Sequence, residues 1–300
     1  MFNLIATLKD EEGNPISDKV VKFYVNNVYI GNSITNVNGI AKFSYISYSY
    51  GKLIVKTVFE GDNNHISSEN NRGVNVANAK VIWKVNNKMS KSTIQSIINK
   101  AASKDIILFA KGIYKGLTLS ISKTLDLRTN GTVNLIGINN KGIAIKVNTN
   151  AIGTSIRGFS IQNYQNGIYN KAKSVNINSN KIYSNAKYGI YNIGKDTLIR
   201  ENRVKSNIKG IYSSVTSTIK YNTLKNCKYG LILSKTAKSV TVYINTVYKN
   251  SKIGICILGS KNKILKNKIS YHKYGIYIKG IKNTISKNIF TKNTMRIVKR

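Results

Sequence analysis

The feature that most constrains this chain is an internal repeat in its second half. A glycine recurs at spacings of 20 to 24 residues, and an apolar residue follows each of these glycines. The repeated glycines are Gly167, Gly189, Gly210, Gly230, Gly254 and Gly275. Repeats of this length are typical of solenoids, in which each unit buries its apolar residues against its neighbours.

Two columns of asparagine keep the same period. The first is Asn180, Asn202, Asn222, Asn245, Asn267 and Asn288. The second is Asn163, Asn185, Asn207, Asn250 and Asn293, with His272 in the place between the last two. Asn and Gly tolerate left-handed backbone, so we expect both to mark sharp corners between short strands. Stacked Asn side chains can also satisfy buried backbone groups at those corners.

The spacing of apolar residues favours strands over helices. Apolar residues come in period-two pairs interrupted by Gly and Asn, and no run shows the 3.6-residue period of a helix. About 22 residues suit three short strands and three turns per coil, with coils rising by about 4.8 Å. We therefore predict a right-handed parallel β-helix over residues 93–300. A short amphipathic helix over 92–102 should cap its open end with Ile94, Ile97, Ile98 and Ala101.

The first 77 residues follow a different pattern. Alternating apolar residues predict strands near 4–8, 20–25, 28–34, 40–45, 53–59 and 66–76, separated by turn signals. So many strands in so short a segment indicate a β-sandwich. Residues 78–92 are expected to be a linker.

Three motifs in this segment resemble the bacterial Ig-like repeats of prokaryotic surface proteins. They are DEEGNPI at 10–16, NGIA at 38–41 and FEGDNN at 59–64, with His65 where the family usually has an aromatic residue. The resemblance implies an Ig-like β-sandwich that serves mostly as a spacer.

The second segment resembles the pectin-lyase-like parallel β-helix family. The match is carried by DIILFAKGIY at 105–114 and by the repeated G-I-Y and N-x-I elements. This family includes polysaccharide lyases, hydrolases and epimerases as well as archaeal adhesin-like surface proteins. The combination with an Ig-like module implies an adhesin-like protein, extracellular or at the cell surface.

Charge separates the two segments. The formal net charge is +37, and residues 81–300 carry 40 basic residues but only four acids: Asp105, Asp126, Asp196 and Glu201. Such a field attracts polyanions in a salt-sensitive way. We expect an acidic polysaccharide or cell-wall polymer as the partner, and no specific nucleic acid, because the lysines recur in every coil instead of gathering in one groove. The chain should be a monomer or part of a longer chain.

The scarcity of acids argues against catalysis. Glycoside hydrolysis usually needs a pair of carboxylates, and Asp126 is expected to pair with Arg128 while Glu201 pairs with a neighbouring arginine. We therefore expect no catalytic residues and no enzyme, with a polysaccharide lyase or hydrolase as the alternative and polyanion or nucleic-acid binding as the second alternative. No His, Cys or acid has metal-ligand spacing, so no metal and no cofactor are expected. Cys227 and Cys256 should be free thiols.

One column of the repeat could bind a ligand. Two residues after the glycines stand Tyr169, Tyr191, Tyr212, Ile232, Cys256 and Tyr277, which should point outward. The four tyrosines, flanked by lysines, could hold sugar rings; alternatively, they are an aromatic ladder that only stabilises its own sheet. The interruption at Ile232 and Cys256 favours the second interpretation.

The ends of the chain bear on its location. The start lacks the charged and apolar blocks of a signal peptide, and no apolar stretch is long enough for a membrane-spanning helix. The last residues stop partway into a coil. These features favour a piece of a longer exported protein, with a diverged gene product or a protein that stays inside the cell as alternatives.

Overall fold

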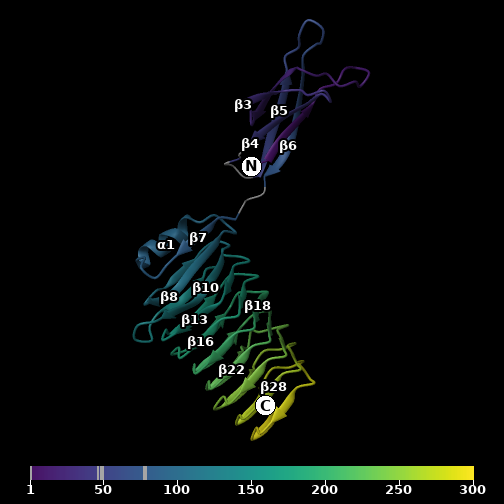
Figure 1. The fold of residues 1–300 in the computed structure, drawn as a ribbon. Coiled ribbons are helices and arrows are strands. Elements are labelled where there is room, and N and C mark those ends of the chain that lie inside the picture. The colour runs from purple at the N-terminus through teal and green to yellow at the C-terminus, as the bar shows by residue number, and fades with distance from the viewer. Residues whose placement is uncertain (1, 46, 48–50, 77–79) are drawn as a thin grey trace. The chain divides into compact units, whose positions relative to one another are not determined.

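The computed structural model describes residues 2–45, 47, 51–76 and 80–300 (Figure 1). The chain divides into two compact units, Met1–Ala79 and Lys80–Arg300. The predicted boundary between residues 77 and 78 lies outside the described residues. Among the described helices, none is long and apolar enough to cross a lipid bilayer.

The first unit contains two antiparallel sheets. One pairs β1 (Phe2–Thr7) with β4 (Ile40–Tyr45), and the other has the order β3 (Val28–Ile34), β2 (Val20–Val25), β5 (Gly51–Phe59) and β6 (Ser68–Val76). Both sheets contribute to one core. The first sheet supplies Leu4 and Ala41, and the second supplies Phe23 and Leu53. Two sheets that share a core form a small β-sandwich, as the alternation of apolar residues predicts.

The second unit is an all-β, right-handed parallel β-helix with one helix, α1 (Lys91–Lys100), among its described residues. It begins with β7 (Ile82–Val85), β8 (Ile106–Lys115) and β10 (Asp126–Ile136), which pair in parallel. Each later coil contributes one strand to each of three parallel ladders, named A, B and C.

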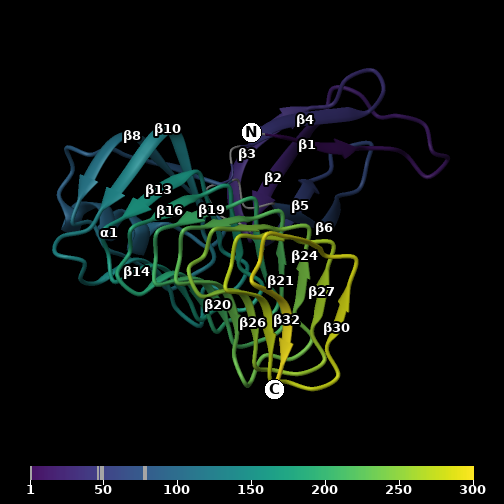
Figure 2. The same ribbon diagram turned by 90° about the horizontal axis from the view of Figure 1, so that it is seen from below.

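Ladder A is a nine-stranded sheet: β9 (Leu119–Ile121), β11 (Ile143–Val147), β14 (Asn166–Asn170), β17 (Tyr188–Asn192), β20 (Lys209–Ser213), β23 (Tyr229–Leu233), β26 (Ile253–Ile257), β29 (Tyr274–Ile278) and β32 (Met295–Lys299). Ladder B continues from the first half of β10 through β12 (Ser155–Arg157), β15 (Asn176–Asn178), β18 (Thr197–Arg200), β21 (Ser217–Lys220), β24 (Thr241–Tyr243), β27 (Lys263–Leu265) and β30 (Thr284–Ser286). Ladder C continues from its second half through β13 (Phe159–Gln162), β16 (Lys181–Tyr183), β19 (Arg203–Lys205), β22 (Thr223–Lys225), β25 (Thr246–Tyr248), β28 (Lys268–Ser270) and β31 (Ile289–Thr291). In Figure 2, β20, β26 and β32 line one side of the coils, and β24, β27 and β30 line another.

The repeat stays in register from coil to coil. Ile168 pairs with Ile190, which pairs with Ile211, and both residues that flank each repeated glycine align with their counterparts one coil later. Inward-facing residues of all three ladders are buried in one continuous core, except at the C-terminal end, where Ile285 and Phe290 are only partly buried. Because each coil covers the apolar residues of the next, the apolar column predicted from the sequence lies inside the core and runs along the axis of the β-helix.

The first asparagine column forms a hydrogen-bonded ladder between B and C. From Asn202 onward, the side-chain Oδ1 of each residue accepts from the backbone N–H of the asparagine one coil earlier, at 2.8–3.0 Å, while Asn180 accepts from the Phe159 N–H. The second column joins C to A in the same way, and His272 takes the place of an asparagine there, as predicted: its Nδ1 lies 3.1 Å from the backbone N of Asn250. Cys227 occupies another place in this column, because its N–H donates to Asn250 Oδ1 at 2.9 Å.

Three details of the predicted corners are wrong. The left-handed residue is the one before each ladder asparagine, such as Glu201 (φ 58°) or Ile244 (φ 48°), and not the asparagine itself. Asn163 is one of these left-handed residues, and Tyr164 takes its expected place in the second column. The repeated glycines lie inside ladder A, where close packing requires them: a Cβ on Gly210 would lie 2.5 Å from the carbonyl oxygen of Gly230.

The helix caps the first coil as predicted. Ser90 is its N-cap and accepts a hydrogen bond from the Thr93 N–H at 3.0 Å, and Ile94, Ile98 and Ala101 are buried in the core. The segment expected to be a linker is partly ordered into the β-helix, since β7 pairs with β8. Asp105 secures this entry by accepting hydrogen bonds from Val81 N, Trp83 Nε1 and Ala102 N.

Candidate functional site

The outer side of ladder A carries the predicted tyrosine column. Tyr169, Tyr191 and Tyr212 occupy matching positions on β14, β17 and β20, and the column continues through Ile232 and Cys256 to Tyr277. The preceding isoleucines are fully buried, so alternation turns the tyrosines away from the core. In the other direction the column runs through Lys146 to Ser120.

The structure brings three of the four predicted tyrosines into contact. The ring centroids of Tyr169 and Tyr191 lie 5.0 Å apart in an edge-to-face arrangement, and those of Tyr191 and Tyr212 lie 4.8 Å apart and stacked. Tyr188 adds a fourth ring, 4.7 Å from Tyr191. Burial in this stack is the main cause that raises the pKa of Tyr191. Tyr277 lies farther along the column and contacts Tyr274 at 6.3 Å.

Ile232 and Cys256, which were expected to interrupt the tyrosine column, are part of the packed surface. Ile232 and Cys256 are buried together with Ile253 in an apolar cluster on the outer side of the sheet. Tyrosines on both sides pack against this cluster: Tyr212, Tyr229, Tyr274 and Tyr277. The column and this cluster, with Tyr188, therefore form one continuous surface, here called the aromatic stripe.

Three of the seven tyrosines of this stripe were not predicted from the sequence. Tyr188, Tyr229 and Tyr274 each stand directly before a repeated glycine, and this position aligns from coil to coil. The signal was present in the sequence as the recurring element Y-G. Strict alternation places this residue and the outward tyrosine on opposite faces, whereas in the structure the rings of Tyr188 and Tyr191 lie 4.7 Å apart.

Lysines border the aromatic stripe. Lys209 Nζ lies 4.7 Å from the centre of the Tyr188 ring and 3.1 Å from its hydroxyl oxygen. Lys171 stands over Tyr169 at 5.3 Å, and Lys252 over Tyr229 at 5.8 Å. None of these ammonium groups has a carboxylate within ion-pair distance among the described residues. The stripe thus combines apolar rings with uncompensated positive charge.

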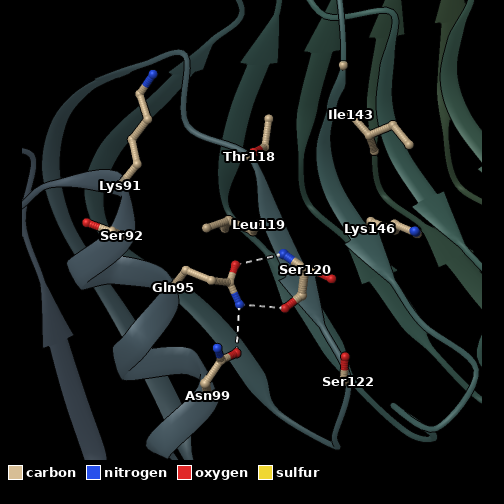
Figure 3. A pocket seen from close by; sticks show the side chains of 11 residues that line it. Lys91, Ser92, Gln95, Asn99, Thr118, Leu119, Ser120, Ser122, Ile143 and Lys146 are labelled. Atoms are coloured by element: carbon tan, nitrogen blue, oxygen red, sulfur yellow. Dashed lines mark hydrogen bonds between the residues drawn. The ribbon is translucent and has the colours of Figure 1, made fainter.

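A polar groove lies at the N-terminal end of the stripe, between α1 and the strands β9 and β11 (Figure 3). Its volume is about 840 Å³, and it is lined by Lys91, Ser92, Gln95, Asn99, Thr118, Leu119, Ser120, Ser122, Gly142, Ile143 and Lys146. Gln95 fixes the helix to the sheet by exchanging hydrogen bonds with the Ser120 backbone at 2.9 and 3.0 Å. Since Ser120 and Lys146 begin the tyrosine column, groove and stripe are continuous.

Each of the four acids of this unit has its own side-chain partners, although the Asp126 N–H donates to the backbone carbonyl of Asp105 at 2.9 Å on the neighbouring coil. Asp126 pairs with Arg128 at 2.6 Å, as predicted, and also lies 3.6 Å from Arg157. Glu201 pairs with Arg200 at 2.9 Å. The remaining two acids are Asp196, which lies 3.6 Å from Lys173, and the buried Asp105 described above.

Residues 120–299 match the model of a family described as "Periplasmic copper-binding protein (NosD)". Copper is held in proteins by thiolate, thioether and imidazole groups. The described residues contain no cluster of three His, Cys, Asp or Glu side chains that could hold a metal. Burial raises the pKa of Cys227 and of Cys256 to about 11, and both ring nitrogens of His272 face backbone atoms. These residues therefore do not fit a copper ion.

Solved structures with the same fold have low sequence identity to this chain. An alginate lyase from Paenibacillus sp. aligns with a TM-score of 0.55 at 13% identity, over 73% of this chain and 100% of its own. The enzymatically active domain of tailspike protein 2 from bacteriophage CBA120 aligns with a TM-score of 0.55 at 11% identity, over 82% of this chain and 48% of its own. A family 28 exopolygalacturonase from Yersinia enterocolitica aligns with a TM-score of 0.50 at 9% identity, over 99% of this chain and 78% of its own. No curated protein matches the sequence.

The expectation that the chain is not an enzyme is contradicted by these neighbours, because the structures that share its fold include a lyase and a polygalacturonase. A count of carboxylates was too narrow a criterion, since glycosidic bonds can also be cleaved with a tyrosine nucleophile or with groups of the substrate. The family model covers more than half of the chain, and the fold agrees with it. The chain therefore belongs to the NosD family of pectin-lyase-like parallel β-helix proteins.

Proposed function

We propose that ladder A binds an acidic polysaccharide, which lies along the aromatic stripe with one end in the groove beside α1. The observation that carries this proposal is the continuity of three features on one face: stacked tyrosines, lysines without carboxylate partners, and a groove lined by amide and hydroxyl groups. Each feature suits a different part of a sugar chain that carries carboxylates.

The chemistry of the surface matches this class of ligand. Tyrosine offers an apolar ring with a polar tip, which suits the mixed apolar and hydroxylated faces of a sugar. The bordering ammonium groups attract carboxylates, and the groove offers hydrogen-bonding partners to hydroxyl groups. The names of two structural neighbours, an alginate lyase and an exopolygalacturonase, point to polysaccharides of the same chemical class.

The proposal includes a place outside the cytoplasm. The family description contains the word periplasmic, and a polysaccharide partner would be met at the cell surface or in the periplasm. There the chain would act as an adhesin-like protein, with the N-terminal sandwich as an Ig-like spacer. This role is supported by the motifs shared with Ig-like repeats of surface proteins and by the separate core of that unit.

Binding to immobilised polygalacturonate and alginate, with dextran as the neutral control, tests the proposal. We expect binding to both acidic chains, little to dextran, and a steep loss as salt rises from 50 to 500 mM, because exposed charges are screened within about 10 Å at 0.1 M salt. Equal binding to dextran, or binding that is unaffected by salt, would contradict the proposal. A DNA mobility shift at physiological salt checks for general polyanion binding, and an assay for new reducing or unsaturated ends measures turnover.

A further inference from the structure

A second groove lies on a different side of the β-helix, on the outer side of ladder C. Its volume is about 520 Å³, and it lies over β16, β19 and β22, with a wall from β10 and β13. Figure 1 labels β10, β13, β16 and β22 along one side of the coils. It is lined by Thr132, Asn134, Ser160, Lys181, Tyr183, Arg203, Val204, Lys205, Thr223 and Lys225. The aromatic stripe lies on another ladder, so this groove is separate from the proposed polysaccharide site.

The strand register gathers four cations in this groove. Lys181 is paired with Arg203, and Lys205 with Lys225, on adjacent strands about 4.8 Å apart. Arg203 and Lys205 flank the buried Val204, so both point outward from the same strand at a separation of roughly 6.6 Å along the strand. All four cations line the groove, and Lys225 Nζ also lies 5.3 Å from the centre of the Tyr248 ring on the next coil.

No acid within the described residues compensates this charge. None of the four cations has a carboxylate within ion-pair distance, and the nearby Glu201 is paired with Arg200 at 2.9 Å. Farther along ladder C the same outward positions carry Thr246, Tyr248, Lys268 and Ser270, so the density of positive charge falls. The cluster is thus a local feature of three strands, which differs from the expectation that the lysines do not gather in one groove.

Neutral groups complete the groove. Lys205 Nζ stands 5.1 Å over the Tyr183 ring, and the Tyr183 hydroxyl lies 3.3 Å from Ser160 Oγ. These contacts limit the positions open to Lys205 and Tyr183. They also place hydroxyl groups that can donate hydrogen bonds beside the cations.

From this arrangement we infer that the groove binds a tetrahedral oxyanion, as carried by phosphate and sulfate esters. A carboxylate has two oxygens in one plane and a single charge, which one arginine can satisfy. A phosphate ester carries about −1.5 to −2 charges and three terminal oxygens that point in different directions. Four donors on several sides match the second geometry, with the fork of Arg203 binding two oxygens and the lysines binding the rest.

The test is titration of the whole chain with inorganic phosphate, sulfate and acetate at constant ionic strength, followed by calorimetry and by the NMR signals of the Tyr183 ring. We expect phosphate and sulfate to bind at least about tenfold more tightly than acetate, and the Tyr183 signals to shift. Arg203→Gln with Lys205→Gln should weaken phosphate binding by about tenfold or more. The matched control, Lys263→Gln with Lys268→Gln, removes the same charge elsewhere and should change the affinity less than twofold.

Two results would overturn the inference: equal affinities for phosphate and acetate, or equal losses of phosphate affinity in the two double variants. Either result would mean that the overall positive charge attracts anions without a specific site. A hexose phosphate and vesicles that contain phosphatidic acid separate the two sources of the ester. Whichever binds in an Arg203-dependent way identifies the source, and failure of both would also contradict the inference. Because polygalacturonate carries carboxylates only, its binding to ladder A is an independent measurement.

Discussion

Asn222 Oδ1 accepts two hydrogen bonds from Asn202, one from its backbone N–H and one from its Nδ2, each at 3.0 Å. Both residues are buried, and the same pair of contacts links Asn180 to Asn202 and Asn245 to Asn267. The interior corner between ladders B and C is thus a chain of amides in which each coil satisfies the polar groups of the previous one.

Replacing a ladder asparagine should therefore destabilise the β-helix. Asn222→Ala leaves the backbone N–H of Asn202 without its acceptor in a buried corner, and it removes the Asn222 Nδ2 group that donates to the Ile199 and Lys220 carbonyls. We expect a loss of roughly 3 kcal/mol in the free energy of unfolding, measured with urea. Asn150→Ala, at an exposed turn, is the control and should cost less than about 0.5 kcal/mol. Equal losses would mean that the amide ladder does not support the fold.

The repeated glycines make a second prediction about stability. Gly210→Ala places a Cβ 2.5 Å from the Gly230 carbonyl oxygen, so neighbouring coils must separate, at a cost of roughly 2–3 kcal/mol. Gly142→Ala is the comparison, because there the nearest atom is 3.7 Å away and only the positive φ of 74° opposes alanine, which costs about 1 kcal/mol. Urea unfolding should rank the two variants in this order.

His272 should make stability depend on pH. Burial is the main cause that lowers its pKa below the usual 6.5, so the folded chain favours the neutral ring. The unfolded chain therefore takes up a proton first, and the stabilisation is complete above about pH 6.5 and is lost as the pH falls below it. His272→Asn restores the usual residue of the column and should remove this part of the dependence. The comparison is the change in unfolding temperature between pH 7.5 and pH 5.5 in both proteins, and identical changes would refute the role of His272.

The two thiols should react slowly in the folded protein. Cys227 and Cys256 are buried and unlinked, and burial raises the pKa of each to about 11. Only a small fraction is thiolate at pH 8, so labelling by a disulfide reagent should be at least about a hundredfold slower than in denaturant. Rapid labelling of either cysteine in the folded chain would contradict the burial described here.

The sequence predicts the coil better than it predicts the surface. Columns such as Ile168, Ile190 and Ile211 follow from local alternation and from the period, and both are visible in the chain. The position of left-handed residues does not follow, because Ile244 adopts φ 48° against its own preference where the packing of neighbouring coils imposes it.

The candidate site was predicted only in part, because only some of its residues follow the repeat pattern. The column of Tyr169, Tyr191 and Tyr212 follows from alternation, and the structure places all three on one face. The contribution of Tyr188 depends on its ring contact with Tyr191, which strict alternation does not predict, and the groove depends on Gln95 reaching Ser120 across 25 residues of sequence. Contacts between distant segments carry no periodic signal, so sequence patterns could not reveal them.

The polysaccharide proposal is tested most directly by the affinity for polygalacturonate of two matched double variants. Tyr169→Ala with Tyr212→Ala removes rings from the aromatic stripe. The control is Tyr221→Ala with Tyr243→Ala, which removes two rings whose centroids lie 6.1 Å apart and which are also bordered by lysines. Tyr243 points outward from ladder B, away from the aromatic stripe. We expect the first variant to lose at least about tenfold in affinity and the second less than twofold. Equal affinities in the two variants would contradict binding along ladder A.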